Sequence, residues 1–150
     1  MSSERLPTGP DPEAITRAIL ERYPDTVTGH AMGATFFSLD ESHWPNFATI
    51  VTTDEHDEGE PSRLSRQGVF RLNIGVGKAT FERLVGAPTP AATDYAALDT
   101  IIPHPVYAKQ RWISILNPSD AQFRGVVVPL LDEAHARLAD ARDRHVPATS

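Results

Sequence analysis

The chain contains no cysteine among its 150 residues. This absence excludes disulfide bonds, thiolate zinc sites, iron–sulfur clusters and a cysteine nucleophile. Long apolar runs are missing too: the longest extends only from Val126 to Leu131, far short of the roughly 18 to 20 residues of a membrane helix. No charged-then-apolar segment typical of a secretory signal stands at the N-terminus. We therefore expect a cytoplasmic protein that does not enter a membrane.

Motifs for metal binding and catalysis are also lacking. The six histidines show no HxH, HxxxH or HExxH spacing, so we expect no metal site, no cofactor and no catalytic residue. The turn from Gly75 to Lys78 lies between a predicted strand and a predicted helix, but Leu72 stands where a Walker motif needs glycine. Ala79 likewise replaces the required Ser or Thr. This turn is therefore either an anion-binding helix start or a plain connection.

The charge is distributed unevenly along the chain. The net charge is −6, yet residues 1–60 hold 12 acidic and 3 basic residues, whereas residues 61–126 hold 4 acidic and 8 basic residues. An anion-attracting surface is therefore expected in the middle of the chain. Five acidic residues crowd into residues 54–62, which predicts a mobile surface loop with nothing to bury. The sequence leaves open whether the basic residues are free or paired with this loop.

Local signals predict helices and strands within one domain. Asp11 before Pro12 is a typical helix start, and the apolar spacing predicts a helix over residues 12–23. Helix signals also cover residues 78–85, with Gly86 as the stop. A last helix is capped by Ser119 and is kinked or divided near residue 128, because Pro129 lies inside it. Runs of β-branched and aromatic residues predict strands at 34–39, 47–53, 69–74 and 112–116.

The predicted order is α-β-β-β-α-β-α, which favours an α+β two-layer sandwich: an antiparallel sheet of about four to five strands with helices on one face. We expect one domain over residues 11–143 and flexible ends at residues 1–10 and 144–150. Alternation places Arg71 and Asn73 on the opposite, open face of the sheet, near Ser114 and threonines of residues 47–53. The predicted core comprises Ile15, Ile19, Phe70, Leu72, Ile74, Phe81, Leu84, Ile113, Ile115, Phe123, Val127, Leu130, Leu131 and Leu138.

Three segments, at residues 47–53, 68–75 and 104–119, together resemble a family of small bacterial proteins known only as a domain of unknown function. The resemblance spans residues 12–140 and implies no activity and no site residues. The element order, with a Trp-bearing strand running into the final helix, also looks like the MmcQ/YjbR proteins, whose fold is similar to that of the iron chaperone CyaY. That likeness implies DNA binding, and the acidic first third of this chain departs from the charge pattern it requires.

The densest group of chemically useful side chains begins at His104, which lies between two prolines and is followed by Tyr107, Lys109 and Arg111. Such a group suits a carboxylate or phosphate, and we expect His104 and Tyr107 to share a pocket with Arg71 or Arg111. In the competing interpretation, His104 is a scaffold residue that bonds the backbone. The candidate ligand-binding residues are Arg71, Asn73, Lys78, His104, Tyr107 and Arg111.

The sequence thus predicts a non-enzymatic domain that binds a small anionic ligand or an acidic partner. Two alternatives stay open. One is a nucleic-acid-binding protein of the MmcQ/YjbR type, although the acidic charge argues against nucleic acid as a partner. The other is an enzyme centred on His104 and Tyr107.

Overall fold

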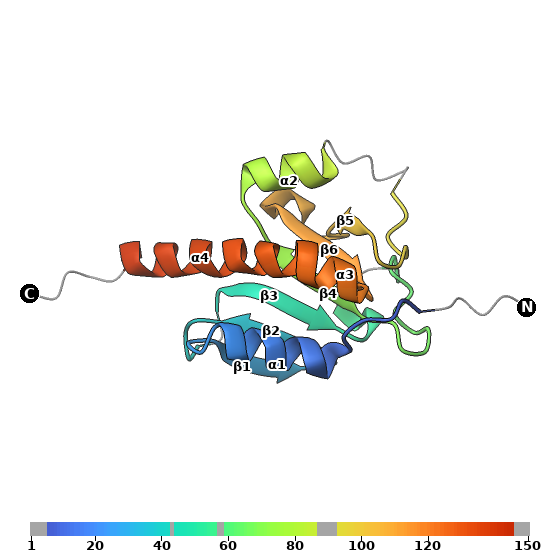
Figure 1. Ribbon diagram of the computed structural model, residues 1–150, viewed down its shortest axis with the longest axis horizontal. Coiled ribbons are helices and arrows are strands. Elements are labelled where there is room, and N and C mark those ends of the chain that lie inside the picture. The colour runs from blue at the N-terminus through green and yellow to red at the C-terminus, as the bar shows by residue number, and fades with distance from the viewer. Residues whose placement is uncertain (1–5, 43, 57–58, 87–92, 146–150) are drawn as a thin grey trace, which may run out of the picture.

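The computed structural model describes residues 6–42, 44–56, 59–86 and 93–145 (Figure 1). Its centre is an antiparallel sheet of six strands in the order β1-β2-β3-β4-β6-β5, which confirms the α+β class and lies close to the expected four to five strands. The strands are β1 (Val27–Ala31), β2 (Ala34–Ser38), β3 (Asn46–Val51), β4 (Arg71–Gly75), β5 (Ile101–Pro103) and β6 (Trp112–Leu116).

The two strands that the sequence did not predict form the two edges of the sheet. β1 contains Gly29 and His30, neither of which favours a strand, and it forms only through pairing with β2. β5 is three residues long and ends at Pro103, which an edge strand tolerates because one side of its backbone needs no ladder partner. Tertiary pairing, rather than local preference, therefore creates both edges.

The helices are α1 (Pro12–Arg22), α2 (Lys78–Val85), α3 (Asp120–Gln122) and α4 (Val128–His145). The predicted caps are present, because Asp11 Oδ1 accepts a hydrogen bond from the Ala14 N–H at 2.8 Å and Ser119 Oγ accepts one from the Gln122 N–H at 3.2 Å. Gly86 ends α2 with φ 62°, a conformation that glycine adopts without strain.

A π-helical turn, Phe123–Val127, separates α3 from α4. It lies where the sequence predicts that Pro129 divides the last helix. Proline lacks an N–H, and its ring clashes with the carbonyl four residues earlier, so a regular α-helical ladder cannot continue through this point. The wider turn accommodates both effects and lets the chain enter α4 without a break.

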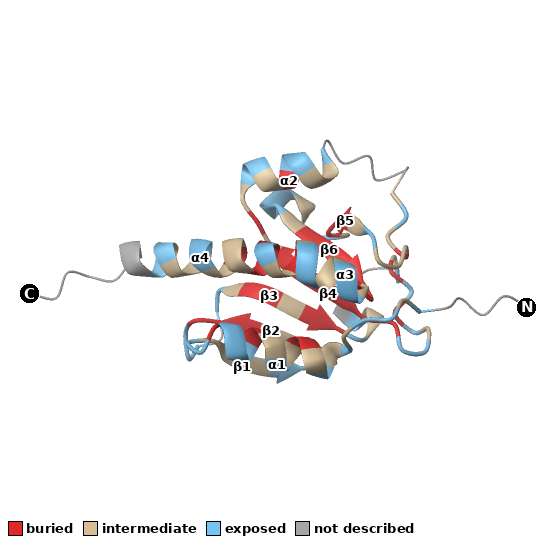
Figure 2. Cartoon of the chain, in the orientation of Figure 1, coloured by how far each residue is buried: buried red, intermediate tan, exposed pale blue. Residues whose placement is uncertain are grey.

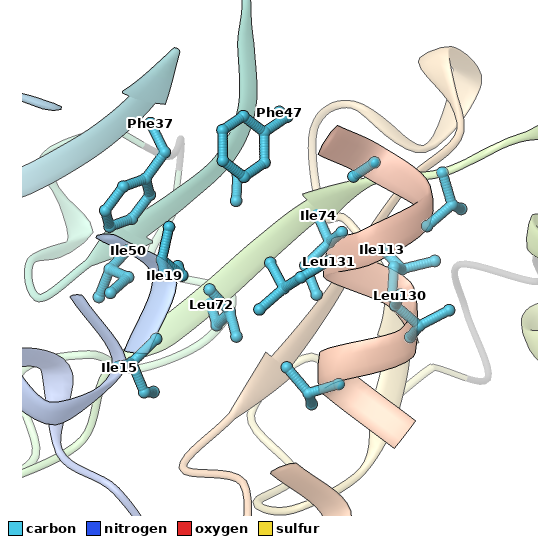
Figure 3. Close-up of a cluster of buried hydrophobic side chains, with 14 of the residues drawn as sticks. Ile15, Ile19, Phe37, Phe47, Ile50, Leu72, Ile74, Ile113, Leu130 and Leu131 are labelled. Atoms are coloured by element: carbon cyan, nitrogen blue, oxygen red, sulfur yellow. The ribbon is translucent and has the colours of Figure 1, made fainter. Parts of the chain in front are cut away.

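The helices α1, α2 and α4 contribute side chains to the main hydrophobic core. Figure 3 shows the part of this core that lies between α1, α4 and the sheet. All of the predicted core residues belong to this cluster; Leu84, Phe123 and Leu138 are partly buried against it and the others are buried. The core extends further than predicted, since Phe37, Phe47 and other side chains of β2 and β3 also contribute. In Figure 2 the strands β3, β4 and β6 are mostly coloured as buried, while α4 alternates between intermediate and exposed residues from 137 to 142.

The prediction of an open second sheet face is wrong over β4 and β6. A smaller hydrophobic cluster lies there. It includes Leu64, Val69, Ile102 and Leu116, and Leu98 packs against it. Leu64 and Leu98 lie outside the predicted strands, whereas Val69 belongs to the predicted strand 69–74 and is placed on this face by its alternation. The hydrophobic effect drives these apolar side chains onto the available sheet face. Segments that precede and follow β4 in the sequence therefore cover the second face.

The acidic loop also differs from its prediction. Asp54–His56 form a short 3₁₀ helix, and Asp54 Oδ1 accepts a hydrogen bond from the Leu64 N–H at 3.0 Å. Ser62, at the end of the segment, is fully buried, so the expectation that residues 54–62 bury nothing is wrong at this position. Asp57 and Glu58 lie outside the described residues.

The flexibility predicted for the two ends remains a prediction. Residues 1–5 and 146–150 lie outside the described residues. Nearer the domain, the Thr8 carbonyl accepts a hydrogen bond from the Asp120 N–H at 2.9 Å. Across the described ranges, no helix combines the length and apolar character needed to cross a bilayer.

Candidate functional site

The structure separates the six candidate residues into two groups. Arg71, Asn73 and His104 are buried, with 1%, 1% and 5% of their surfaces exposed. Lys78, Tyr107 and Arg111 are exposed. The six residues therefore do not share one exposed surface, and the two groups are described in turn.

A buried polar network lies on the second face of the sheet. Asn73 pairs across the sheet with Thr49 on one side and Ser114 on the other, as the alternation predicts. Its Oδ1 accepts hydrogen bonds from Ser114 Oγ at 2.7 Å and Arg71 Nε at 2.9 Å, and its Nδ2 donates to Thr49 Oγ1 at 3.0 Å. Arg71 Nη1 donates to Ser62 Oγ at 3.1 Å.

This network corrects the prediction that Arg71 and Asn73 face a ligand from an open sheet. Ser62 and the apolar side chains of the smaller cluster close the face above them. Buried polar groups are costly unless they are hydrogen-bonded, and here the protein itself supplies the partners. We therefore assign Arg71 and Asn73 to the scaffold.

His104 organises the hairpin between β5 and β6. Its Nδ1 accepts hydrogen bonds from the N–H groups of Val106 and Tyr107, both at 3.0 Å, which makes this nitrogen the unprotonated one. The Tyr107 ring lies against the imidazole, with centroids 4.9 Å apart. The geometry supports the scaffold interpretation of His104, since two backbone donors already occupy Nδ1.

The same hairpin holds Arg111 in a fixed position. Arg111 adopts φ 63° and ψ 36°, the left-handed region that costs a side-chain-bearing residue about 1 kcal/mol or more. Its N–H donates to the Ala108 carbonyl at 2.9 Å, and its own carbonyl accepts from the Val76 N–H at 3.2 Å. These bonds tie the hairpin to the segment that enters α2.

The start of α2 already carries an internal anion. Glu133 of α4 accepts hydrogen bonds from the Gly77 N–H at 2.7 Å and from Thr80 Oγ1 at 2.6 Å. A carboxylate is the expected partner for a helix N-terminus. Of the two interpretations of the Gly75–Lys78 turn, the structure therefore favours the plain connection. Gly75 also allows Trp112 to pack closely there, since a Cβ would lie only 3.0 Å from Cε2 of Trp112.

Lys78 and Arg111 nevertheless meet at a pocket of about 480 Å³ between α2 and the β5–β6 hairpin. We call it the basic pocket. It is lined by Lys78, Phe81, Glu82, Gly86, Ala108, Lys109 and Arg111. Neither His104 nor Tyr107 lines it, so the structure does not bring these two residues together with Arg111 at this pocket. His104 contributes indirectly, by shaping the hairpin that presents Lys109 and Arg111.

The electrostatics of the basic pocket favour an anion. Three cations face one carboxylate, that of Glu82. Within the described ranges, none of Lys78, Lys109 and Arg111 forms an ion pair or a side-chain hydrogen bond. Unpaired cations at one concave surface raise the local concentration of anions and can bind a carboxylate or phosphate directly.

Sequence reasoning named Lys78 and Arg111, grouped Lys109 with them, and missed the apolar wall. Phe81 was assigned to the core only, although three-residue spacing places it on the face of α2 that carries Lys78. Ala108 gave no signal, because an alanine in an irregular segment has no distinctive chemistry. Helical spacing was therefore the one usable sign of the pocket wall.

Other clusters in the described part of the chain do not form a comparable site. A second pocket, of about 420 Å³, is lined mainly by Thr52, Thr53 and acidic side chains of the 54–60 segment. No group of three or more histidine, aspartate or glutamate side chains among the described residues is placed to hold a metal ion.

A polar cluster joins α1 to α4. Asp132 accepts hydrogen bonds from the Arg22 guanidinium, at 2.7 and 2.9 Å, and from the Tyr23 hydroxyl. The bond from Arg22 holds the pKa of Asp132 below its usual value, whereas burial raises the pKa of Tyr23. His135 stacks on Tyr23 and contacts Asp25 at 2.9 Å. These groups satisfy one another and stabilise the contact between the two helices.

Comparison with known families shows to which family the chain belongs. A family model described as "Family of unknown function (DUF6194)" matches residues 10–147, so the chain belongs to this family. No curated protein and no solved structure matches it. The expected resemblance to a domain-of-unknown-function family is thus confirmed, while the likeness to MmcQ/YjbR proteins receives no support.

Proposed function

We propose that this protein is a non-enzymatic binding domain whose basic pocket takes a small anionic ligand. The observation that carries the proposal is the convergence of Lys78, Lys109 and Arg111 on one pocket without a protein carboxylate paired to any of them within the described ranges. Pockets of this volume accommodate small molecules. The αL backbone of Arg111 is a second support, since strained residues cluster at ligand sites.

The test is calorimetric titration with acetate and with inorganic phosphate at low and moderate salt. We expect both anions to bind the wild type, and we expect Lys109→Ala and Arg111→Gly to lose the signal. Arg83→Ala and Arg124→Ala are the matched controls, because both residues are exposed, do not line the pocket and remove the same charge. Equal binding by all four variants, or no binding by the wild type, would refute the proposal.

The same protein preparations separate the alternatives. A nucleic-acid-binding protein would shift a DNA or RNA probe in a gel, and its affinity would fall steeply with salt. In an enzyme centred on His104, Nδ1 would be committed to the two backbone hydrogen bonds that it accepts, so any proton transfer would have to use Nε2. Tight, salt-sensitive retardation of DNA would replace the anion-binding proposal with the first alternative.

A further inference from the structure

The floor of the basic pocket carries information about the rest of the ligand. Phe81 of α2, which is 7% exposed, and Ala108 of the hairpin are the apolar side chains that line the pocket beside the core. The cations Lys78, Lys109 and Arg111 are exposed, so their charged ends reach solvent around this apolar wall. The pocket therefore combines two chemistries, a cationic rim and an apolar floor.

A bare inorganic anion satisfies only one of these chemistries. The pocket, at about 480 Å³, has the volume of on the order of fifteen water molecules. A phosphate ion held by the rim would leave most of this volume filled with water against Phe81 and Ala108. Replacing that water by an apolar group is favourable, because the free energy falls when apolar surface is removed from contact with water.

Glu82 restricts the charge of the ligand. It lines the pocket four residues after Lys78, which is one turn further along the same face of α2. A second anionic group placed beside Glu82 would be repelled by its carboxylate, although the lining as a whole is positive. A single anionic head with an uncharged body avoids that repulsion.

We infer that the ligand is an amphipathic organic monoanion, a carboxylate whose alkyl or aromatic body lies on Phe81 and Ala108 while its head contacts the cationic rim. This inference rests on the proposed function and goes beyond it by naming the ligand class. Arg111 contributes a cation whose backbone position the hairpin fixes. The apolar body gains its affinity from the floor.

The test is a titration of the folded protein with acetate, butanoate and hexanoate below micelle-forming concentrations, with hexanol and inorganic phosphate as comparators. We expect the dissociation constant to fall roughly fourfold for each methylene that the floor covers. Hexanol, which lacks the charge, should bind much more weakly than hexanoate. Equal affinities for acetate and hexanoate, or for hexanol and hexanoate, would overturn the inference.

Ala108→Leu tests the floor without changing any charge, because the larger side chain fills it. We expect this variant to lose the chain-length dependence and still bind phosphate. Ala121→Leu, at an exposed position of α3, is the control for the substitution itself. Melting curves would identify a variant that fails to fold. In that case Lys78→Met, measured with the same series of carboxylates, tests the cationic rim instead.

The outcomes distinguish this inference from the proposed function. If all carboxylates and phosphate bind equally and Arg111→Gly abolishes their binding, the anion site stands and the amphipathic ligand is wrong. If no anion binds the wild type, both are wrong. If affinity rises with chain length in the wild type but not in Ala108→Leu, both are supported.

Discussion

The molecule has two cationic regions that look alike in sequence and differ in structure. Arg71 belongs to one of them and lies on a sheet face beneath Ser62, where its guanidinium bonds to protein side chains. Lys78, Lys109 and Arg111 belong to the other and surround a pocket with no ion-pair partner in the described part of the chain. Both regions come from the basic middle of the sequence. The difference lies in what covers them, and it separates a scaffold from a binding surface.

The comparison shows that charge in a sequence does not by itself indicate a ligand. A buried guanidinium must be desolvated, so it stabilises the fold only when the fold supplies its hydrogen bonds. An exposed cation keeps its water and remains free to exchange it for a ligand. Substitutions in the two regions should therefore affect different measurements, stability in one and binding in the other.

The largest effect is expected for Arg71→Ala. Loss of this buried side chain leaves a cavity and removes hydrogen-bond partners from Asn73 and Ser62, so the free energy of unfolding should fall by about 3–5 kcal/mol. Urea denaturation measures the change. Arg71→Met, which retains much of the volume, should restore part of the loss. A fall below about 1 kcal/mol would show that the network does not stabilise the fold.

His104→Ala should have the next largest effect, about 2–3 kcal/mol, because two backbone N–H groups lose their acceptor and the buried ring is removed. His104→Asn is the sharper variant, since its Oδ1 lies at the same reach as Nδ1 and can accept the same bonds. We expect Asn to recover a large part of the stability that Ala loses. Equal losses in the two variants would contradict the scaffold role.

Glu133→Ala should lower stability by about 1–2 kcal/mol, because the start of α2 loses the carboxylate that accepts from Gly77 and Thr80. Glu133→Gln keeps one acceptor oxygen and should lose less. Thermal melting of both variants tests this order. An unchanged melting temperature in Glu133→Ala would mean that water replaces the cap at no cost.

Arg111→Gly should separate stability from binding most clearly. Glycine adopts φ 63° without strain, so stability should stay the same or rise by up to about 1 kcal/mol. Anion binding should be lost, since the guanidinium is gone. Denaturation and calorimetry on one sample measure both quantities. A variant that is clearly destabilised, or that binds anions as well as the wild type, would break the distinction between the two regions.

The smallest effect concerns Asp132, in the polar cluster that joins α1 to α4. Its pKa is lowered from the ordinary value of 3.8 by the hydrogen bond from Arg22. Because its pKa is lowered in the folded state, this carboxylate stabilises the fold at pH values above its ordinary pKa. That stabilisation is lost as the pH falls through its folded pKa. Asp132→Asn should therefore flatten the acid limb of the stability curve below about pH 4, and an unchanged limb would contradict this.

Most of the fold that the sequence predicts depends on interactions between residues close together in the chain. Side-chain caps at Asp11 and Ser119, and the alternation in β4, act through near neighbours, so the sequence alone shows them. The edge strands β1 and β5 depend on a partner strand and were missed. Pattern could place Arg71 on the second sheet face. It could not show that Leu64 and Leu98 close that face, because contacts between distant segments leave no local signal.

The candidate site was predictable to a similar degree. Lys78 and Arg111 were named from their residue types, and the structure brings them to one pocket. His104 was named for its chemistry, yet its role is to shape the hairpin, which depends on backbone N–H groups that carry no residue-specific signal. Burial decides between these roles, and burial is a property of the assembled fold.

One measurement tests the difference between the two regions most directly: an NMR titration of the ¹⁵N-labelled protein with hexanoate, following the backbone amides. We expect the shifts to concentrate on residues 78–86 and 108–111, with residues 49, 71, 73 and 114 unchanged. Shifts centred on Arg71 and Asn73, with the basic pocket silent, would show that the buried network is the binding surface and would contradict the account.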